Sequence, residues 1–165
     1  MSKVITVPAT PEGLRMAADW LRDYAKEVEV NAKLLLEAML EVGERWMITD
    51  IQHIDTGQTI STIAGYRNGN KGYLLVGGAA VWIEFGTGVV RNVGNDPHPK
   101  AAELGMSPWG TFGKGFGSRP QGWWYVGDDG EAHHTYGIRG NKFVYNTAQY
   151  LRIACPTMAK EIFSE

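Results

Sequence analysis

The chain has 165 residues, of which 44% are hydrophobic and 21% charged, a composition typical of a soluble globular domain and not of a disordered chain. Its 16 basic and 18 acidic side chains leave a formal net charge of −2, which argues against tight binding to a phosphate backbone. The single cysteine, Cys155, rules out an intrachain disulfide, and no apolar run reaches membrane-spanning length. We expect one soluble domain over residues 1–165, made in a cytoplasm.

The first predicted element is a long helix that begins at Pro11. Thr10 supplies a hydroxyl N-cap and Glu12 an acid in the first turn. Apolar residues then recur at steps of three and four, which predicts one apolar stripe: Leu14, Ala18, Leu21, Ala25, Val28, Ala32, Leu35, Met39, Val42 and Trp46. We expect the helix to end near Met47, or to bend near Val30-Asn31. A helix this long exceeds the needs of a small core, so part of it is expected to reach a partner.

Residues 58–66 and 73–76 predict a β-hairpin around an Asn/Gly-rich turn at 68–72. The next segment, Val81-Trp82-Ile83-Glu84-Phe85-Gly86-Thr87-Gly88, places one carboxylate among large apolar side chains just before two glycines. Residues 79–85 fit either a short strand or a helical turn capped by Gly86.

Residues 88–122 are predicted to form a long loop rich in glycine and proline. Loops of this length are usually functional or disordered when free, and this one carries the candidate anchors Trp109, Phe112 and Phe116. A second hairpin is predicted from Trp123-Trp124-Tyr125-Val126, a turn at 127–130 and residues 131–136.

The last predicted element is a helix whose apolar face contains Phe143, Ala148, Leu151, Ala154, Met158 and Ile162. Pro156 is expected to kink or divide it. The order of elements predicts an α+β fold, in which the long N-terminal helix and the kinked C-terminal helix pack on a small antiparallel sheet of two hairpins.

Three features invite a catalytic or ligand-binding interpretation. Glu84 could act as a buried general acid, but a glycan hydrolase needs a second carboxylate and none is near it in sequence. His133 and His134 would point to opposite faces of a strand and could not chelate one ion. The glycine-rich stretch 110–117 lacks the Gly-Lys-Ser/Thr ending of a phosphate-binding loop. We therefore expect no catalytic residue, metal or cofactor.

The Trp-rich hairpin could be a stacking platform for bases or sugars. We favour packing instead, with Trp123 and Tyr125 on one face of the hairpin and Trp124 on the other. The residues alone indicate a protein that works through its surfaces.

Four motifs in order resemble the neck or tail-completion (head–tail joining) protein family of long-tailed double-stranded DNA bacteriophages. They are Ala80-Val81-Trp82-Ile83-Glu84-Phe85-Gly86-Thr87, Asp96-Pro97-His98-Pro99, Gly122-Trp123-Trp124-Tyr125 and Phe143-Val144-Tyr145-Asn146-Thr147-Ala148. The likeness spans almost the whole chain. One departure is Lys142, where the family usually has proline.

The resemblance implies a structural virion protein at the head–tail junction, assembled in the host bacterial cytoplasm. Its expected form is a homo-oligomeric, sixfold ring that lets DNA pass. Its expected partners are head-side connector or stopper proteins and a tail terminator or tail tube protein. Glu84 would be a structural pin held by amides around Gly86-Thr87, with Phe85 in the core. The long loop and the N-terminal helix would contact neighbours.

Three alternatives remain open at this point. A tail terminator that caps the tail tube would carry the same features. A cell-wall glycan hydrolase would use Glu84 as its acid and the Trp hairpin as its platform. A host-directed binding module would associate with a bacterial protein outside particles.

Overall fold

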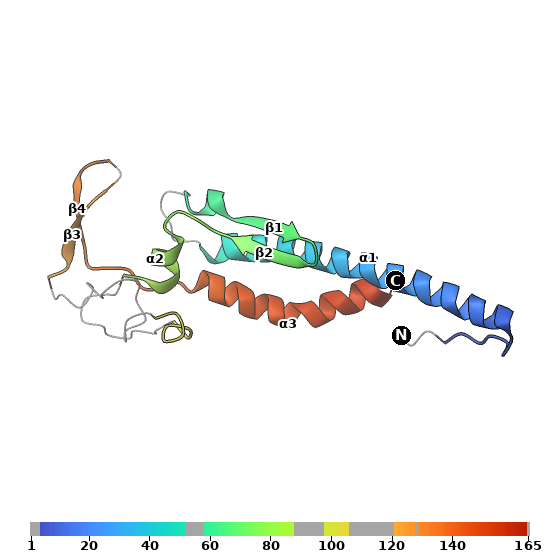
Figure 1. Ribbon diagram of the computed structural model, residues 1–165. Coiled ribbons are helices and arrows are strands. Elements are labelled where there is room, and N and C mark those ends of the chain that lie inside the picture. The colour runs from blue at the N-terminus through green and yellow to red at the C-terminus, as the bar shows by residue number, and fades with distance from the viewer. Residues whose placement is uncertain (1–3, 52–57, 88–97, 106–120, 128, 165) are drawn as a thin grey trace.

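The protein, represented by a computed structural model, is described over residues 4–51, 58–87, 98–105, 121–127 and 129–164. Its elements are helix α1 (Pro11–Asp50), the 3-10 turn η1 (Ile60–Thr62), strands β1 (Ala64–Asn68) and β2 (Lys71–Leu75), helix α2 (Ala80–Phe85), strands β3 (Trp123–Val126) and β4 (Ala132–Thr135), and helix α3 (Phe143–Ser164). The molecule is elongated: α1 lies beside α3, β1–β2 runs along α1, and β3–β4 projects beyond α2 (Figure 1). The α+β class is confirmed, and the two hairpins form separate two-stranded sheets.

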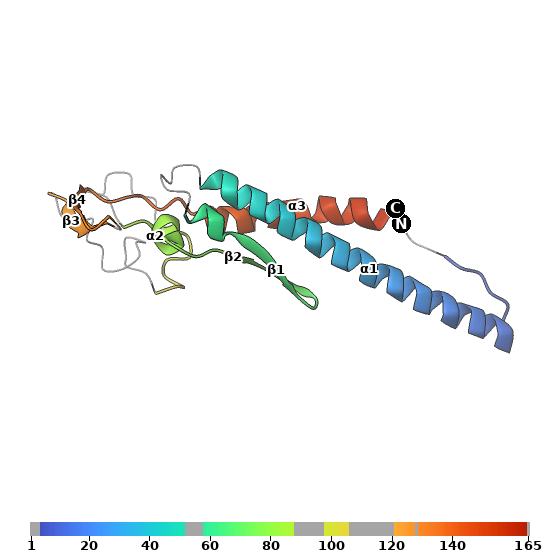
Figure 2. The ribbon, with the colours of Figure 1, turned by 90° about the horizontal axis from the view of Figure 1, so that it is seen from above.

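Helix α1 is continuous over 40 residues, about 60 Å at 1.5 Å per residue, so the alternative with a bend at Val30-Asn31 is wrong. Its start follows the prediction, because Thr10 Oγ1 accepts a hydrogen bond from the Gly13 N–H at 3.1 Å. The N-terminal half of α1 extends past both the β1–β2 hairpin and α3 (Figure 2). Most of this helix is therefore exposed.

Glycines allow the β1–β2 hairpin to lie close against α1. A Cβ atom at Gly72 would come within 2.7 Å of Leu36 Cδ1, and one at Gly65 would meet the Glu44 carboxylate. On the outer face, the cross-strand partners Tyr66 and Tyr73 have ring centroids 6.3 Å apart, and both are exposed. The hairpin thus packs through its glycine face and presents an aromatic face to solvent.

Residues 58–63 do not form the predicted strand. They contain η1, in which the hydroxyls of Ser61 and Thr62 donate to the carbonyls of Gln58 and Thr59, both at 2.7 Å. Short hydroxyl side chains compete in this way with strand pairing. The β-branched composition that predicted a strand there was outweighed by these local bonds.

The hydrophobic core is small and sits where the C-terminal end of α1 meets α2 and the start of α3. Its buried apolar residues are Met47, Ile51, Ala80, Ile83 and Phe143. Helix α3 continues through Pro156 as one helix, so the expectation that it divides there is wrong, and Figure 1 shows it bending gently along its length. Among the described residues, no helix is long and apolar enough to cross a membrane.

Candidate functional site

The motif around Glu84 forms helix α2 and its cap. The Gly86 N–H donates to Trp82 O at 2.7 Å, and Gly86 has φ 74° and ψ 170°. This backbone conformation is essentially confined to glycine. The helical-turn interpretation of residues 79–85 is therefore confirmed, and the strand interpretation is wrong.

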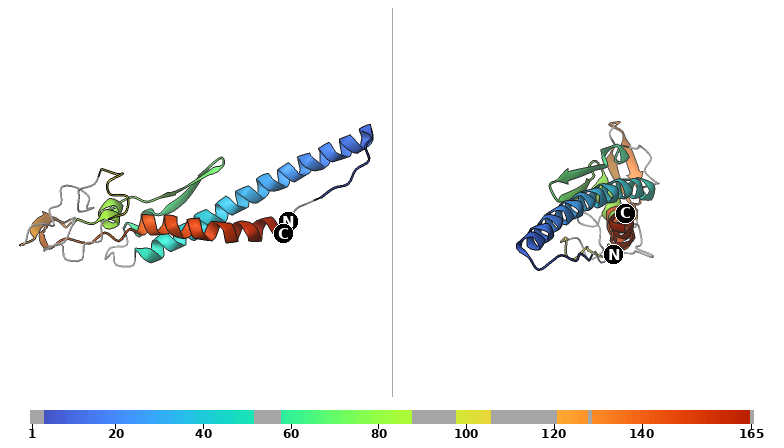
Figure 3. Two further views of the ribbon diagram at one scale, coloured as in Figure 1. Left: turned by 90° about the horizontal axis from the view of Figure 1, so that it is seen from below. Right: turned by 90° about the vertical axis from the view of Figure 1, so that its right-hand side faces the viewer.

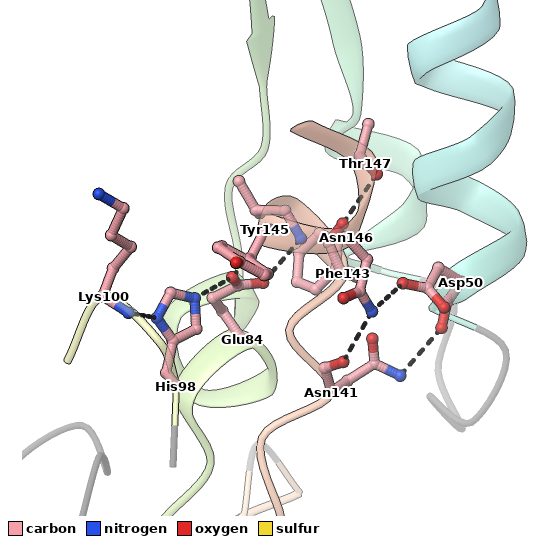
Figure 4. A network of polar contacts seen from close by, with 10 residues as sticks. Asp50, Glu84, His98, Lys100, Asn141, Phe143, Tyr145, Asn146 and Thr147 are labelled. Atoms are coloured by element: carbon pink, nitrogen blue, oxygen red, sulfur yellow. Dashed lines mark hydrogen bonds and ion pairs between the residues drawn. The ribbon is translucent and has the colours of Figure 1, made fainter. Parts of the chain in front are cut away.

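The Glu84 carboxylate caps the N-terminus of α3. Its Oε2 accepts from the Val144 N–H at 2.7 Å, and its Oε1 accepts from the Tyr145 N–H at 3.0 Å (Figure 4). Both N–H groups lie in the first turn of α3, where no carbonyl of the helix itself can accept them. A negative charge at this end also interacts favourably with the helix dipole. Glu84 is only 5% exposed, so it pins two helices together.

The prediction that backbone amides hold Glu84 was wrong about which amides they are. Glu84 is held by amides of α3, 60 and 61 residues further along the chain, and not by amides around Gly86-Thr87. Phe85, expected in the core, is half-buried and lies against the His98 ring, with centroids 4.5 Å apart.

His98 completes the set of donors around the carboxylate. Its Nε2 lies 2.7 Å from Glu84 Oε1, and its Nδ1 accepts from the Lys100 N–H at 3.0 Å. Because Nδ1 accepts a hydrogen bond, the proton is on Nε2, which donates to Glu84. The His98 and Glu84 side chains are 4% and 7% exposed. Sequence reasoning missed this role of His98, although a buried carboxylate requires donors.

The chain that leads into α3 closes over the end of α2. The Asn141 N–H donates to Ile83 O at 2.7 Å, and the Lys142 N–H donates to Glu84 O at 3.1 Å. One step further out, the Thr87 N–H donates to Ile138 O, and the Ile138 N–H donates to Thr87 Oγ1, both at 3.0 Å. The bonds to Ile83 O and Glu84 O satisfy carbonyls that α2 leaves free at its C-terminus. Glu84 is therefore bonded twice over: its backbone carbonyl accepts from the segment that precedes α3, and its side chain accepts from the first turn of α3.

A second set of polar contacts ties the end of α1 to the same place. Asn146 Nδ2 donates to Asp50 Oδ2 and Asn141 Nδ2 donates to Asp50 O, both at 2.9 Å (Figure 4). Asn141 Oδ1 is buried and has no hydrogen-bond partner among the described residues. Helices α1 and α2 therefore both make contacts at the start of α3.

The start of α3 explains why a cap from another element is needed. Lys142 precedes the helix with φ 62°, a left-handed conformation, and its side chain has no acceptor atom to cap the helix. We expect Lys142→Pro to lower the free energy of unfolding by about 3 kcal/mol or more, because proline fixes φ near −65° and lacks the N–H that bonds Glu84 O.

The matched variant at this position is Lys142→Gly, which keeps the N–H and adopts positive φ without strain. It should be as stable as the wild type or more so in urea denaturation. A Lys142→Pro variant of wild-type stability would contradict this backbone conformation.

The polar atoms of Glu84 and His98 are engaged within the fold. An apolar groove of about 400 Å³ lies beside Glu84, which is the only acid among its lining residues. Both oxygens of Glu84 and both ring nitrogens of His98 are already bonded. In the parts of the chain that are described, no three His, Cys, Asp or Glu side chains gather in a way that could hold a metal ion. The geometry is that of a structural joint.

The candidate interface residues are only partly placed. Trp109, Phe112 and Phe116 lie outside the described residues. In the β3–β4 hairpin Trp123 is half-buried, whereas Trp124 is 68% and Tyr125 50% exposed. Trp123 and Tyr125 line a groove of about 370 Å³ together with Trp82 of α2. Packing therefore accounts for Trp123, while Trp124 stays exposed with its ring edge-on to His134 at 5.1 Å.

The adjacent histidines of β4 have separate partners. His133 Nε2 lies 2.9 Å from Asp129 Oδ2, while His134 Nε2 donates to Gln121 O at 2.8 Å. The pKa of Asp129 is lowered from its usual value, chiefly by the Glu131 N–H and next by the hydrogen bond to His133. The two rings stabilise the hairpin through different contacts.

Compared with known proteins, the chain matches no family model, no curated protein sequence and no solved structure. The functional assignment therefore has to rest on the motifs and on the geometry of the joint.

Proposed function

We propose that this protein is a structural component of a bacteriophage virion that forms a ring at the head–tail junction. In this role it completes the connector or the tail, so that the two can join and DNA can pass. The proposal rests on the four ordered motifs of the sequence together with one structural observation. The described part of the chain has a small core and exposes large apolar side chains along its length.

Large exposed apolar side chains in a soluble protein mark surfaces that a partner covers. They occur on the N-terminal half of α1, on the outer face of β1–β2 and on β3–β4, for example Leu14, Tyr66 and Trp124 at 69%, 53% and 68% exposure. Because these patches differ in place and composition, one patch of a copy can contact a different patch of the next copy. Such head-to-tail contacts can close into a ring. The net charge of −2 suits a channel through which DNA slides without being gripped.

The joint at Glu84 supports a structural role. It holds α2 against α3 at the base of the segment that carries the Trp-rich hairpin (Figure 1). In a ring this joint would fix the direction in which the hairpin faces its neighbour. Partners on the two sides would be head-side connector or stopper proteins and the tail terminator or tail tube.

The test is electron microscopy of particles made by the encoding phage or prophage with this gene stopped early. We expect DNA-filled heads beside separate tails of normal length, and joined particles when the wild-type gene is supplied from a plasmid. Overlong tails would identify a tail terminator instead. Intact joined particles would overturn the proposal and leave a hydrolase or a host-directed binding module as the alternatives.

The same complementation test can locate a contact. Supplying Trp124→Ala should fail to restore joining, because this 68% exposed ring is expected to be buried against a neighbour. The matched control is Ile153→Ala, which removes an apolar side chain that is 77% exposed on α3. If Trp124→Ala joins heads to tails as well as the control does, the β3–β4 hairpin is not the contact.

A further inference from the structure

The apolar residues of α1 follow a strict heptad repeat. From Leu14 to Trp46 the steps alternate between four and three residues without interruption, the spacing of a coiled-coil seam. In the N-terminal half one core position holds the larger side chains Leu14, Leu21 and Val28, and the other holds Ala18, Ala25 and Ala32. These six residues are called the seam below.

The C-terminal end of the apolar stripe meets α3 within the chain. Trp46 stacks on Tyr150 of α3 with ring centroids 4.0 Å apart, and at Gly43, which neighbours the stripe, a Cβ atom would lie 3.1 Å from Leu151 Cδ1. Toward its N-terminus α1 diverges from α3, as Figure 3 shows from below. There Leu14 and Leu21 are 69% and 57% exposed. The apolar stripe of α1 thus has a partner in α3 at its C-terminal end and none within the described chain at its N-terminal end.

A heptad repeat predicts that the covering element is another helix. We propose that the seam is covered by the same segment of a second copy of this chain, running antiparallel. The pair would be a two-fold dimer of the free protein. It goes beyond the proposed ring, because a two-fold contact uses one patch on both copies and closes on itself.

Side-chain size selects the antiparallel orientation. In a parallel pair each alanine would face an alanine and leave a gap, whereas an antiparallel pair sets every alanine against a larger residue. The layers would be Leu14 on Ala32, Ala18 on Val28, and Leu21 on Ala25, each formed twice by symmetry. Layers of one large and one small side chain let the helices approach closely along the whole segment.

The charges beside the seam agree with this orientation. Arg15 of one copy would lie beside Glu29 of the other, again twice by symmetry, and would add an ion pair to the one that Glu29 already makes with Lys33 at 2.6 Å. Arg22 would lie near its own symmetry mate, a repulsion reduced by its ion pair with Asp19. The acidic and basic side chains of residues 12–33 are mixed, which argues against the Lys/Arg-rich face of a membrane-surface helix.

A groove receives the end of the second helix. It has a volume of about 360 Å³ and lies between α1 and the tip of the β1–β2 hairpin, where Ala25, Val28, Ala32, Gly69 and Asn70 are among its lining residues. In the antiparallel register, Leu14 of the second copy lies opposite Ala32 and so enters this groove. The register that pairs large with small side chains along the seam therefore also places Leu14 in the groove.

The first test is sedimentation equilibrium of the full chain over a wide range of concentrations. We expect a reversible monomer–dimer equilibrium for the wild type. Ala25→Arg places a charge in the middle of the seam and should raise the Kd by on the order of a hundredfold. The matched control is Val30→Arg, which adds the same side chain at an exposed site on the opposite side of α1 and should leave the Kd unchanged.

A wild-type protein that stays monomeric up to about 1 mM, where binding is weaker than about −4 kcal/mol, would overturn the proposal. Equal effects of Ala25→Arg and Val30→Arg would overturn it as well. Circular dichroism of both variants verifies that α1 is intact. These results concern the isolated protein, so they are independent of the particle experiment that tests head–tail joining.

The orientation is tested by distances between spin labels in a Cys155→Ala background. Labels at Glu12→Cys should be separated along the pair axis by about 33 Å, because residue 12 lies 11 residues from the two-fold centre near residue 23. Labels at Asp23→Cys should show almost no axial separation. Similar short distances at both positions would indicate a parallel pair and overturn the antiparallel register.

Discussion

Replacing Glu84 by Gln is expected to lower the free energy of unfolding by about 2–3 kcal/mol. The carboxylate accepts hydrogen bonds from Val144 N–H, Tyr145 N–H and His98 Nε2–H. An amide keeps one acceptor oxygen but turns an NH2 group toward a donor at the other position. At least one donor in a buried site then loses its partner, and the cost of that loss exceeds the worth of an ordinary hydrogen bond.

Urea denaturation followed by circular dichroism measures this change, and Glu103→Gln is the matched control. Glu103 belongs to the same described segment as His98, but its side chain is 66% exposed and pairs with the exposed Lys100. Its removal should change the free energy of unfolding by less than about 0.5 kcal/mol. Equal stabilities of the Glu84→Gln variant and the wild type would mean that Glu84 does not cap α3.

Replacing Gly86 by Ala should have a larger effect, about 4 kcal/mol or more. The conformation of Gly86, with positive φ and extended ψ, strains any other residue by about 1–3 kcal/mol. A Cβ atom there would also lie 2.6 Å from Ile138 O and 2.8 Å from Arg139 C. The segment that closes over α2 would have to move away, breaking the bonds to Thr87 and Glu84 O described above.

Gly130→Ala separates the two causes. Gly130 also has positive φ, at 78°, but a Cβ atom there would meet nothing within 4 Å. This variant should lose only the backbone strain, about 1 kcal/mol. Thermal or urea unfolding of both variants provides the comparison, and a loss at Gly86 no greater than that at Gly130 would show that the close approach of the two segments is not required.

Local signals predicted most of the elements. The N-cap at Thr10 and the spacing of apolar residues predicted α1 to within three residues of its observed end. Both signals could be read from the sequence because each depends on residues that are close together in the chain. The pairing of both hairpins and the helical start at Phe143 were also confirmed. The strand predicted at residues 58–63 failed because hydroxyl bonds to nearby carbonyls formed a 3-10 turn instead.

The site was harder to predict because its contacts join distant parts of the chain. The sequence indicated that Glu84 is buried and structural, but not that its partners are the amides of Val144 and Tyr145. Backbone N–H groups are the same in every residue except proline, so no side-chain pattern marks them as partners. His98 was missed for a related reason: its role depends on its distance from Glu84 in space.

The cap on α3 also bears on the order in which the chain folds. Val144 lies 60 residues after Glu84, which corresponds to a delay of about 3–12 s at ordinary rates of translation. During that time α1 and the β1–β2 hairpin can already pack. The Glu84 carboxylate of α2, in contrast, has no hydrogen-bond donors from α3, because α3 has not yet been made. Contacts this distant in sequence form late and slow the search for the native state. Helix α1 would therefore be exposed on a newly made chain before α3 exists, and the direction of the Trp-rich hairpin would be fixed only once α3 has formed.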